Sequence, residues 1–133
     1  MEINPTQREL EILKILWQQD HVTVRDVWNQ LSGRDKELAY TTVLSLLQTM
    51  EKKGLVGHQL VGKAYAYFAK VRRSETVREL AGQFLERVFD GAVDEYLVHA
   101  LDLRRVSPEE LDRLEAMIAE AKKKCGPRRK PGA

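Results

Sequence analysis

The chain has 133 residues, of which 43% are hydrophobic and 32% charged, and its formal net charge at pH 7 is only +2. This length fits one ordinary domain or two very small ones, and the hydrophobic fraction excludes a disordered chain. Apolar runs are short and the first residues lack a secretory signal, so we expect a cytoplasmic protein without a membrane span. A single cysteine, Cys125, excludes an internal disulfide and a multi-cysteine metal site.

The small net charge is an average over blocks of opposite sign. Residues 34–73 carry eight Lys or Arg and three acids, whereas residues 74–121 carry five bases and twelve acids. Residues 122–133 carry six bases and no acid. Net charge alone argues against a nucleic-acid partner, but this asymmetry suggests an anion-binding region beside an acidic one. Ordinary solvated helix faces are the alternative that the charge count leaves open.

Three helices are predicted in the first part of the chain. The first covers residues 5–18, with Asn4 as its cap and a proline at its first position. The second covers residues 24–32, with Thr23 as its cap and a glycine after its end. The third runs from about residue 38 to a glycine at position 54, with two lysines in its last turn.

After the third helix the apolar period changes to that of strands. Residues 55–60 and 64–69 are short segments rich in Val, Tyr and Phe, and residues 61–63 join them. Tyr65 and Tyr67 are two residues apart and therefore share one face of the second strand. Three helices followed by a β-hairpin is the order of a winged helix-turn-helix. The predicted fold class is therefore mainly α, with a small β-hairpin wing.

The rest of the chain is predicted to be helical, apart from a basic tail. Ser74 caps a helix that Asp90 and Gly91 interrupt, and Ser107 with a following proline opens the last helix. The tail is rich in Pro and Gly and is expected to be disordered. The predicted domains are residues 1–73 (winged helix), residues 74–121 (helical dimerisation) and residues 122–133 (tail).

The helices of residues 74–121 carry apolar stripes that a unit of about 50 residues buries poorly. We therefore expect them to form a homodimer, although packing on the winged helix in a monomer is the alternative. The residues expected in the dimer interface are Leu80, Phe84, Leu85, Val88, Phe89, Tyr96, Leu97, Leu114, Met117 and Ile118.

The third predicted helix has an apolar face and an opposite face of hydroxyl and amide side chains. Such side chains donate to phosphates and reach base edges, whereas carboxylates repel the DNA backbone, and Glu51 is the only acid in this helix. A soluble helix that happens to be rich in Thr is the alternative for this face alone. The predicted DNA-binding residues are Thr41, Thr42, Ser45 and Gln48 for base edges, Arg34, Lys36, Lys52, Lys53, His58 and Lys63 for phosphates, and Tyr40, whose role stays open.

Several motifs match a known pattern. Residues 39–43 read Ala-Tyr-Thr-Thr-Val, residues 51–56 read Glu-Lys-Lys-Gly-Leu-Val, and residues 62–67 read Gly-Lys-Ala-Tyr-Ala-Tyr. With residues 9–13 and 23–27 for the first two helices, the chain resembles the BlaI/MecI/CopY family of bacterial repressors. The resemblance implies a winged-helix DNA-binding domain, a helical dimerisation domain and a homodimer that represses transcription from a palindromic operator. It also points to genes of β-lactam resistance or related stress responses.

The resemblance covers about residues 3–121, and two departures limit what it implies. Copper-responsive members use paired cysteines near the C-terminus, so the single Cys125 argues against copper sensing. Penicillinase repressors are cut by a membrane sensor protease at an Asn-Phe bond, which this sequence lacks. Residues 96–101 correspond to that stretch. The inducing signal, a sensor protease or another system, therefore stays open.

Other chemistry is not indicated by the sequence. His21, His58 and His99 are scattered and not at metal-ligand spacing, so no metal is expected. Neither a nucleophile arrangement nor a Gly-rich phosphate loop is present, so we expect no cofactor and no enzyme. A second hypothesis keeps the fold but makes it a protein-interaction module for an acidic partner, because fold does not fix function.

Overall fold

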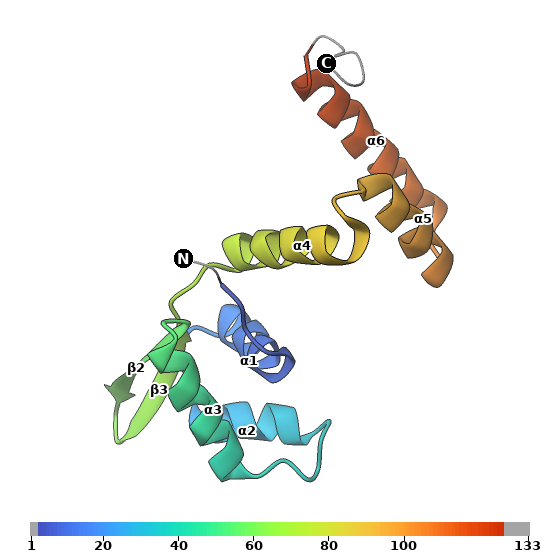
Figure 1. Cartoon of the computed structure of the whole chain (residues 1–133). Coiled ribbons are helices and arrows are strands. Elements are labelled where there is room, and N and C mark those ends of the chain that lie inside the picture. The colour runs from blue at the N-terminus through green and yellow to red at the C-terminus, as the bar shows by residue number, and fades with distance from the viewer. Residues whose placement is uncertain (1–2, 127–133) are drawn as a thin grey trace. The chain divides into compact units, whose positions relative to one another are not determined.

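The computed structural model describes residues 3–126, which contain six helices and three strands (Figure 1). This composition confirms the predicted fold class. The chain divides into two compact units, one ending at Phe84 and the other beginning at Leu85. The elements are α1 (Gln7–Gln18), β1 (Val22–Thr23), α2 (Val24–Ser32), α3 (Tyr40–Lys52), β2 (Val56–Val61), β3 (Ala64–Ala69), α4 (Arg73–Phe89), α5 (Val93–Leu103) and α6 (Pro108–Lys124).

A reciprocal cap fixes the start of α1. The Thr6 hydroxyl accepts a hydrogen bond from the Glu9 backbone N–H at 3.2 Å, and the Glu9 carboxylate accepts one from the Thr6 N–H at 2.8 Å. The predicted cap, Asn4, is wrong, because Thr6 is the residue with a glutamate three positions later. The predicted end of the helix at Gln18 is confirmed.

A hydrogen bond from a side chain of α2 fixes the loop between α2 and α3. Thr23 caps α2 as predicted, since its hydroxyl accepts from the Asp26 N–H at 3.2 Å. The Trp28 indole N–H donates to the Leu38 carbonyl at 2.8 Å. α3 therefore begins at Tyr40, two residues later than expected, because Leu38 is still part of the loop that Trp28 holds.

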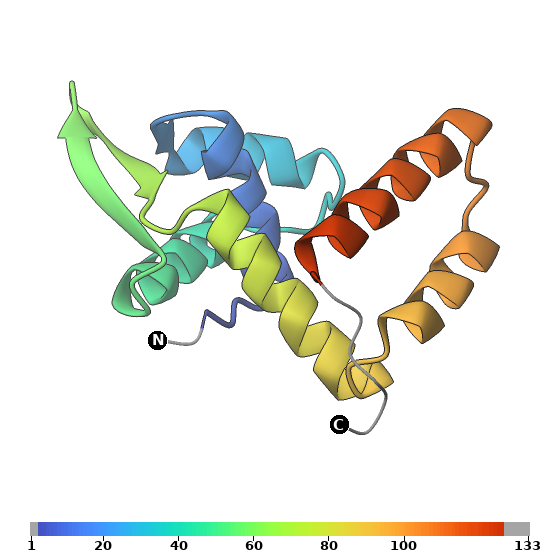
Figure 2. The ribbon, with the colours of Figure 1, turned by 90° about the horizontal axis from the view of Figure 1, so that it is seen from above.

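The sheet has three antiparallel strands in the order β1-β3-β2. β2 and β3 form the predicted hairpin, in which Val61 lies opposite Ala64 and Gly62 makes the turn with a φ of 65°. Figure 2 shows this hairpin projecting from the helices of the first unit. β1, in which Val22 pairs with Tyr67, was not predicted. A strand of two residues is too short to show the alternation of apolar and polar residues by which strands are recognised in a sequence.

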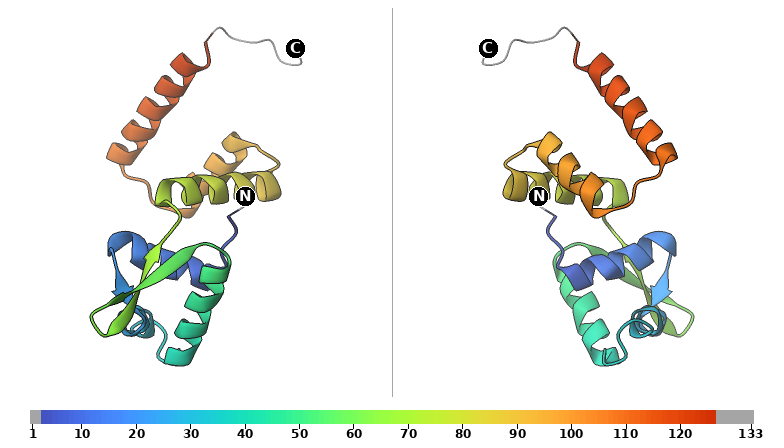
Figure 3. Two further views of the ribbon diagram at one scale, coloured as in Figure 1. Left: turned by 90° about the vertical axis from the view of Figure 1, so that its left-hand side faces the viewer. Right: turned by 90° about the vertical axis from the view of Figure 1, so that its right-hand side faces the viewer.

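The core of the first unit lies between α1, α2, α3 and the sheet. Figure 3 shows α3 beside the hairpin in this unit. Side chains from all of these elements have no more than 2% of their surface exposed. They are Ile12, Leu13, Val22, Val27, Val43, Leu47, Met50, Val56 and Ala66. Because this core joins α3 to the sheet, the third helix and the hairpin are held in one fixed arrangement.

The second unit has no comparable core in the described residues. Neither α5 nor α6 contains a buried residue. The break between α4 and α5 is the predicted one: Asp90 and Gly91 both have positive φ, and the Gly91 N–H donates to the Leu85 carbonyl at 3.1 Å. Ser107 caps α6, as predicted, by accepting from the Glu110 N–H.

The ends of the C-terminal helices differ from the prediction. α4 begins at Arg73, so Ser74 lies inside the helix and is not its cap. α6 continues through Lys124, so the expected disorder is wrong for residues 122–124; lysines are favourable at the C-terminus of a helix. The remainder of the predicted tail, from residue 127, lies outside the described residues.

The boundary between the two compact units falls within α4, after Phe84. The N-terminal part of this helix belongs to the first unit, where the Glu79 carboxylate accepts from the Ile3 N–H at 3.1 Å. The Gln83 side-chain amide donates to the Ile3 carbonyl at 3.3 Å. The domain boundary after residue 73 remains a prediction, and the contacts show that α4 does not start a separate compact body.

Candidate nucleic-acid interface

The exposed face of α3 is polar and nearly free of acids. One side of the helix packs into the core through the buried side chains of Val43, Leu47 and Met50. The opposite side is exposed and consists of Thr41, Thr42, Ser45, Gln48, Thr49 and Lys52. The hydroxyl and amide residues expected to meet base edges therefore all lie on the exposed surface of α3, as one stripe along the helix.

The N-terminus of α3 is open. Ala39 occupies the cap position with extended backbone, and it has no side chain that could accept from the first N–H groups. Helix N-termini with free N–H groups attract anions, phosphates in particular. The Leu38 carbonyl, held by Trp28, fixes the position of this end relative to α2.

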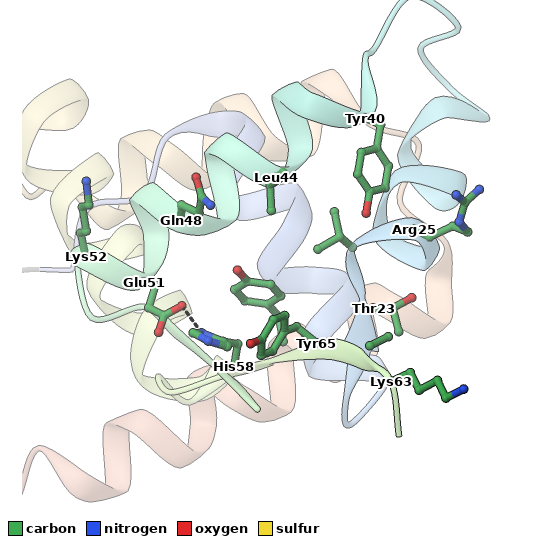
Figure 4. Close-up of a pocket in the computed structure, with 13 residues that line it drawn as sticks. Thr23, Arg25, Tyr40, Leu44, Gln48, Glu51, Lys52, His58, Lys63 and Tyr65 are labelled. Atoms are coloured by element: carbon green, nitrogen blue, oxygen red, sulfur yellow. Dashed lines mark hydrogen bonds and ion pairs between the residues drawn. The ribbon is translucent and has the colours of Figure 1, made fainter. Parts of the chain in front are cut away.

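A groove of about 1110 Å³ runs between α3 and the hairpin (Figure 4). Gln48 and Lys52 lie on the wall that α3 contributes, and His58, Lys63 and Tyr65 on the wall that the hairpin contributes. Gln48 and Lys52 also belong to the exposed polar stripe of α3. The stripe and the groove are therefore one continuous surface.

An acid–histidine pair crosses this groove. His58 Nδ1 lies 2.6 Å from Glu51 Oε1, the dashed line of Figure 4. The imidazole also contacts the rings of Tyr65 and Tyr67, with centroids 5.1 and 5.4 Å away. Burial raises the pKa of the Tyr67 hydroxyl, and the Glu51 charge raises it further, so this hydroxyl stays protonated. Glu51, the one acid of α3, is thus engaged by His58.

Several residues that line the groove were not in the predicted set, among them two from the start of α2. Arg25 and Thr23, from the start of α2, line the groove beside Tyr40. The Arg25 guanidinium carbon lies 5.9 Å from the centre of the Tyr40 ring, and Figure 4 shows the two side chains next to each other. Tyr40 is 39% exposed and lines the groove. The sequence placed Arg25 in the first turn of a predicted helix, and nothing else in the sequence indicated that this side chain would line the groove.

Lys53 differs from its neighbour Lys52. Its ammonium group lies 2.9 and 3.0 Å from the two carboxylate oxygens of Glu9, and the Glu9 residue is only 1% exposed. Burial raises the pKa of Glu9, but hydrogen bonds from Thr6 and the charge and hydrogen bonds of Lys53 outweigh it and hold the pKa below its usual value. Lys53 thereby joins the end of α3 to the start of α1.

The two basic residues of the loop before α3 lie apart from the groove. Lys36 is exposed near the start of α3. Arg34 lines a shallow hollow with Arg8 and Lys14 of α1. The structure therefore brings together Tyr40, Gln48, Lys52, His58 and Lys63 of the predicted DNA-binding set around one groove, with Thr41, Thr42 and Ser45 on the adjoining stripe.

The residues predicted for dimerisation fall into two groups. Leu80 and Phe84 belong to the first unit and line a groove against α1. The others belong to the second unit, where Val88, Met117 and Ile118 are at least 49% exposed. Phe89 and Tyr96 stack edge to face with ring centroids 5.6 Å apart.

Among residues 3–126, no group of three or more His, Cys, Asp and Glu side chains is placed to hold a metal ion. No helix of the described residues has the length and apolar character needed to cross a membrane.

Three helices and a hairpin, with a polar third helix exposed beside the hairpin, define a winged helix-turn-helix protein of the DNA-binding regulator class. Comparison with known proteins narrows this class. Residues 5–120 match the penicillinase repressor family, and the chain belongs to that family. Its members are transcriptional repressors and not enzymes, so this protein is a DNA-binding transcriptional repressor.

The most informative relatives are similar over nearly their whole length. The transcriptional regulator BlaI of Mycobacterium tuberculosis is 35% identical over 127 residues, which cover 94% of this chain and 90% of the relative. The penicillinase repressor of Bacillus licheniformis is 25% identical over 114 residues, or 86% and 88% of the two chains. The methicillin resistance regulatory protein MecI of Staphylococcus aureus is 18% identical over 110 residues, or 83% and 89%.

Solved structures support the fold. A MarR family protein from Bacillus stearothermophilus has a TM-score of 0.53 and 19% identity, covering 94% of this chain and 78% of that one. A variant of S. aureus MepR bound to an oligodeoxyribonucleotide has a TM-score of 0.50 and 20% identity, covering 90% and 79%. At these identities the likeness concerns the fold alone.

Proposed function

We propose that this repressor binds a palindromic operator as a homodimer, with α3 of each copy in the major groove. The observation that carries the proposal is the uninterrupted polar stripe of α3, continuous with the groove beside the hairpin. A helix of this kind fits the major groove of B-DNA, where each base pair presents a distinct set of donors and acceptors.

Base edges and phosphates are assigned to different residues. Thr41, Thr42, Ser45 and Gln48 face the bases, because their short hydroxyl and amide side chains donate and accept without repelling DNA. Phosphates are assigned to the free N–H groups at the start of α3 and to the basic side chains around it. These are Arg25, Lys36, Lys52, His58 and Lys63, with Tyr40 beside Arg25. Glu51 engages only the Nδ1 atom of His58, so the other ring nitrogen is assigned to a phosphate, whereas Lys53 is left out because Glu9 engages its one ammonium group.

The second unit is the part that supports dimerisation. α5 and α6 bury none of their residues in a single chain, although Val93, Val98, Leu103, Met117 and Ile118 are large and apolar. A second copy of the chain carries the same apolar surface and is the partner that would cover these side chains. Two-fold symmetry of the protein requires two-fold symmetry of the site, hence a palindrome with its half-sites about one helical turn or a multiple of it apart.

For the target genes and the inducer, we propose only a class of each. Relatives are named for control of penicillinase and methicillin resistance, so genes of β-lactam resistance or related stress responses are the first targets to test. A sensor protease or another inducer would release the operator. The sequence has no Asn-Phe bond, so cleavage at such a bond is not part of the proposal.

Selection of genomic fragments tests the proposal directly. The full chain is mixed with sheared genomic DNA in physiological salt, the bound fragments are sequenced, and affinities for the enriched site and a scrambled duplex are compared. We expect a shared palindrome bound about 10³-fold or more tightly than the scrambled sequence. Equal affinity for the two duplexes would overturn the proposal and favour the protein-interaction module with an acidic partner.

A further inference from the structure

A second groove lies within the first unit, between α1 and the N-terminal part of α4. Its volume is about 500 Å³, and it shares no lining residue with the groove beside α3. Leu10 and Trp17 of α1 form one wall, and Val77 and Leu80 of α4 form the other. Cavities of this size and apolar character commonly hold small organic molecules.

The charged residues of this groove all have one sign. Among residues 3–126, Lys14 and Arg73 are its only ionisable lining residues, and both are exposed. Neither makes an ion pair with any residue in the part of the chain that the structure describes. The nearby Glu11 is engaged by Arg8 at 3.1 Å. The groove therefore combines apolar walls with two cations that have no counter-ion among the described residues.

We propose that this groove binds a small apolar carboxylate. The apolar body of the ligand lies between Trp17 and Leu80, and its carboxylate reaches Lys14 or Arg73 at the rim. Burial of the body supplies the affinity, and the two cations select an anion over a neutral molecule. A ligand there contacts both α1 and α4, the helix that leads out of the first unit.

The indole groups offer a site-specific readout of binding. The protein has two tryptophans, and the Trp17 indole N–H donates to the Val71 carbonyl at 2.9 Å, whereas that of Trp28 donates to Leu38. The ¹⁵N-labelled full chain is titrated with 2-naphthoate, and a parallel titration uses the neutral 2-naphthylmethanol. The Trp28→Phe variant assigns the two indole signals.

We expect 2-naphthoate to shift the Trp17 signal saturably, with a dissociation constant of about 1 mM or tighter, and to leave the Trp28 signal in place. Lys14→Gln with Arg73→Gln should weaken 2-naphthoate by about tenfold and leave 2-naphthylmethanol unchanged. Lys122→Gln is the matched control, because it removes an exposed cation outside the groove. Ala81→Trp, which fills the groove, should abolish binding of both compounds.

Three results would overturn this proposal. The first is a Trp17 signal that does not move, or that moves equally with Trp28. The second is equal weakening of the acid and the alcohol by the double variant. The third is a changed sedimentation coefficient of the Ala81→Trp variant, since that would make the groove an interface between two copies of the chain. The first two outcomes do not bear on operator binding, which is measured separately.

Discussion

Lys52 and Lys53 are adjacent in the sequence but have different surroundings in the structure. Lys52 lies on the exposed stripe of α3 at the edge of the groove, where a phosphate can approach it. Lys53 points back to α1 and holds the carboxylate of Glu9. A run of basic residues in the sequence thus contains both a DNA contact in our proposal and a structural ion pair.

A matched pair of variants separates the two roles. Lys52→Met should lower the slope of log K against log salt concentration by about one, because one phosphate contact is lost. Lys53→Met should leave that slope unchanged and lower the free energy of unfolding by about 1–3 kcal/mol, since Glu9 stays buried without its cation. Anisotropy titrations at several salt concentrations and urea unfolding measure the two quantities. A reduced slope for Lys53→Met would show that this residue also contacts DNA.

The Glu9 carboxylate makes stability depend on pH in the acid range. Its pKa in the folded protein is below the ordinary glutamate value of about 4.3, so the ionised form stabilises the fold. This contribution is complete above the pKa of the unfolded chain and is lost as the pH falls through the pKa of the folded protein. Urea unfolding from pH 7 to pH 3 should show a large difference between wild type and Glu9→Gln at neutral pH and a smaller one at low pH. A constant difference would contradict the assignment.

Among the secondary-structure elements, α3 has an N-terminus without a side-chain cap, and we expect a cap introduced there to change both stability and operator affinity. Ala39→Ser and Ala39→Asp both supply the missing cap, because the backbone at this position is already extended, and each should stabilise the fold by about 1 kcal/mol. If a phosphate occupies this end of α3, the aspartate should weaken operator binding by about tenfold and the serine much less. Thermal unfolding and anisotropy titrations check both effects, and equal operator affinities of the two variants would place the phosphate elsewhere.

The polar stripe of α3 predicts how sequence preference depends on single side chains. Ser45→Ala removes a hydroxyl that faces a base edge in the proposal, so it should reduce discrimination against a changed base pair by about 1–3 kcal/mol. Affinities for the operator and for duplexes with one substituted base pair provide the measurement. Ser74→Ala, an exposed serine of α4, is the control and should keep the full discrimination. If Ser45→Ala weakened all duplexes alike, Ser45 would be a backbone contact.

Elements with local signals could be predicted from the sequence. The caps at Thr23 and Ser107 and the change of apolar period before the hairpin depend on neighbours in the chain, and the structure has them as expected. β1 and the Glu9–Lys53 pair could not be predicted in this way. β1 exists only because Val22 pairs with Tyr67, and Lys53 meets a residue 44 positions away. Such contacts depend on how the helices pack.

In the candidate site, too, features with a local sequence signal could be predicted, and features that depend on helix packing could not. The stripe of α3 could be predicted because helical spacing alone puts its residues on one side. Arg25 could not, since it reaches the groove only through the packing of α2 against α3, and neither could the engagement of Glu51 by His58. The sequence therefore predicts which side of α3 is polar and exposed better than it predicts the charges around that helix.

For the whole molecule, the question is what covers the apolar side chains of the second unit. Met117 and Ile118 on α6 are 63% and 49% exposed in the single chain, and Leu103 at the end of α5 is 83% exposed. A unit that leaves such residues in water gains little from folding alone. In the homodimer that we propose, dimerisation and operator binding would be coupled, because each copy would contribute one α3 to a symmetric site.

Met117→Glu tests this coupling. A carboxylate in an apolar interface is costly, so this variant should sediment as a monomer at concentrations where the wild type is a dimer. Its affinity for the full palindrome should fall to about that for a single half-site, since the second α3 is no longer tethered to the first. Ala119→Glu adds the same charge two positions further on, about 200° around α6 from Met117, and should change neither property. If Met117→Glu stayed dimeric while Ala119→Glu became a monomer, the interface would lie on the other face of α6. If both variants stayed dimeric, the second unit would not hold the copies together, and the coupling would have to come from the first unit.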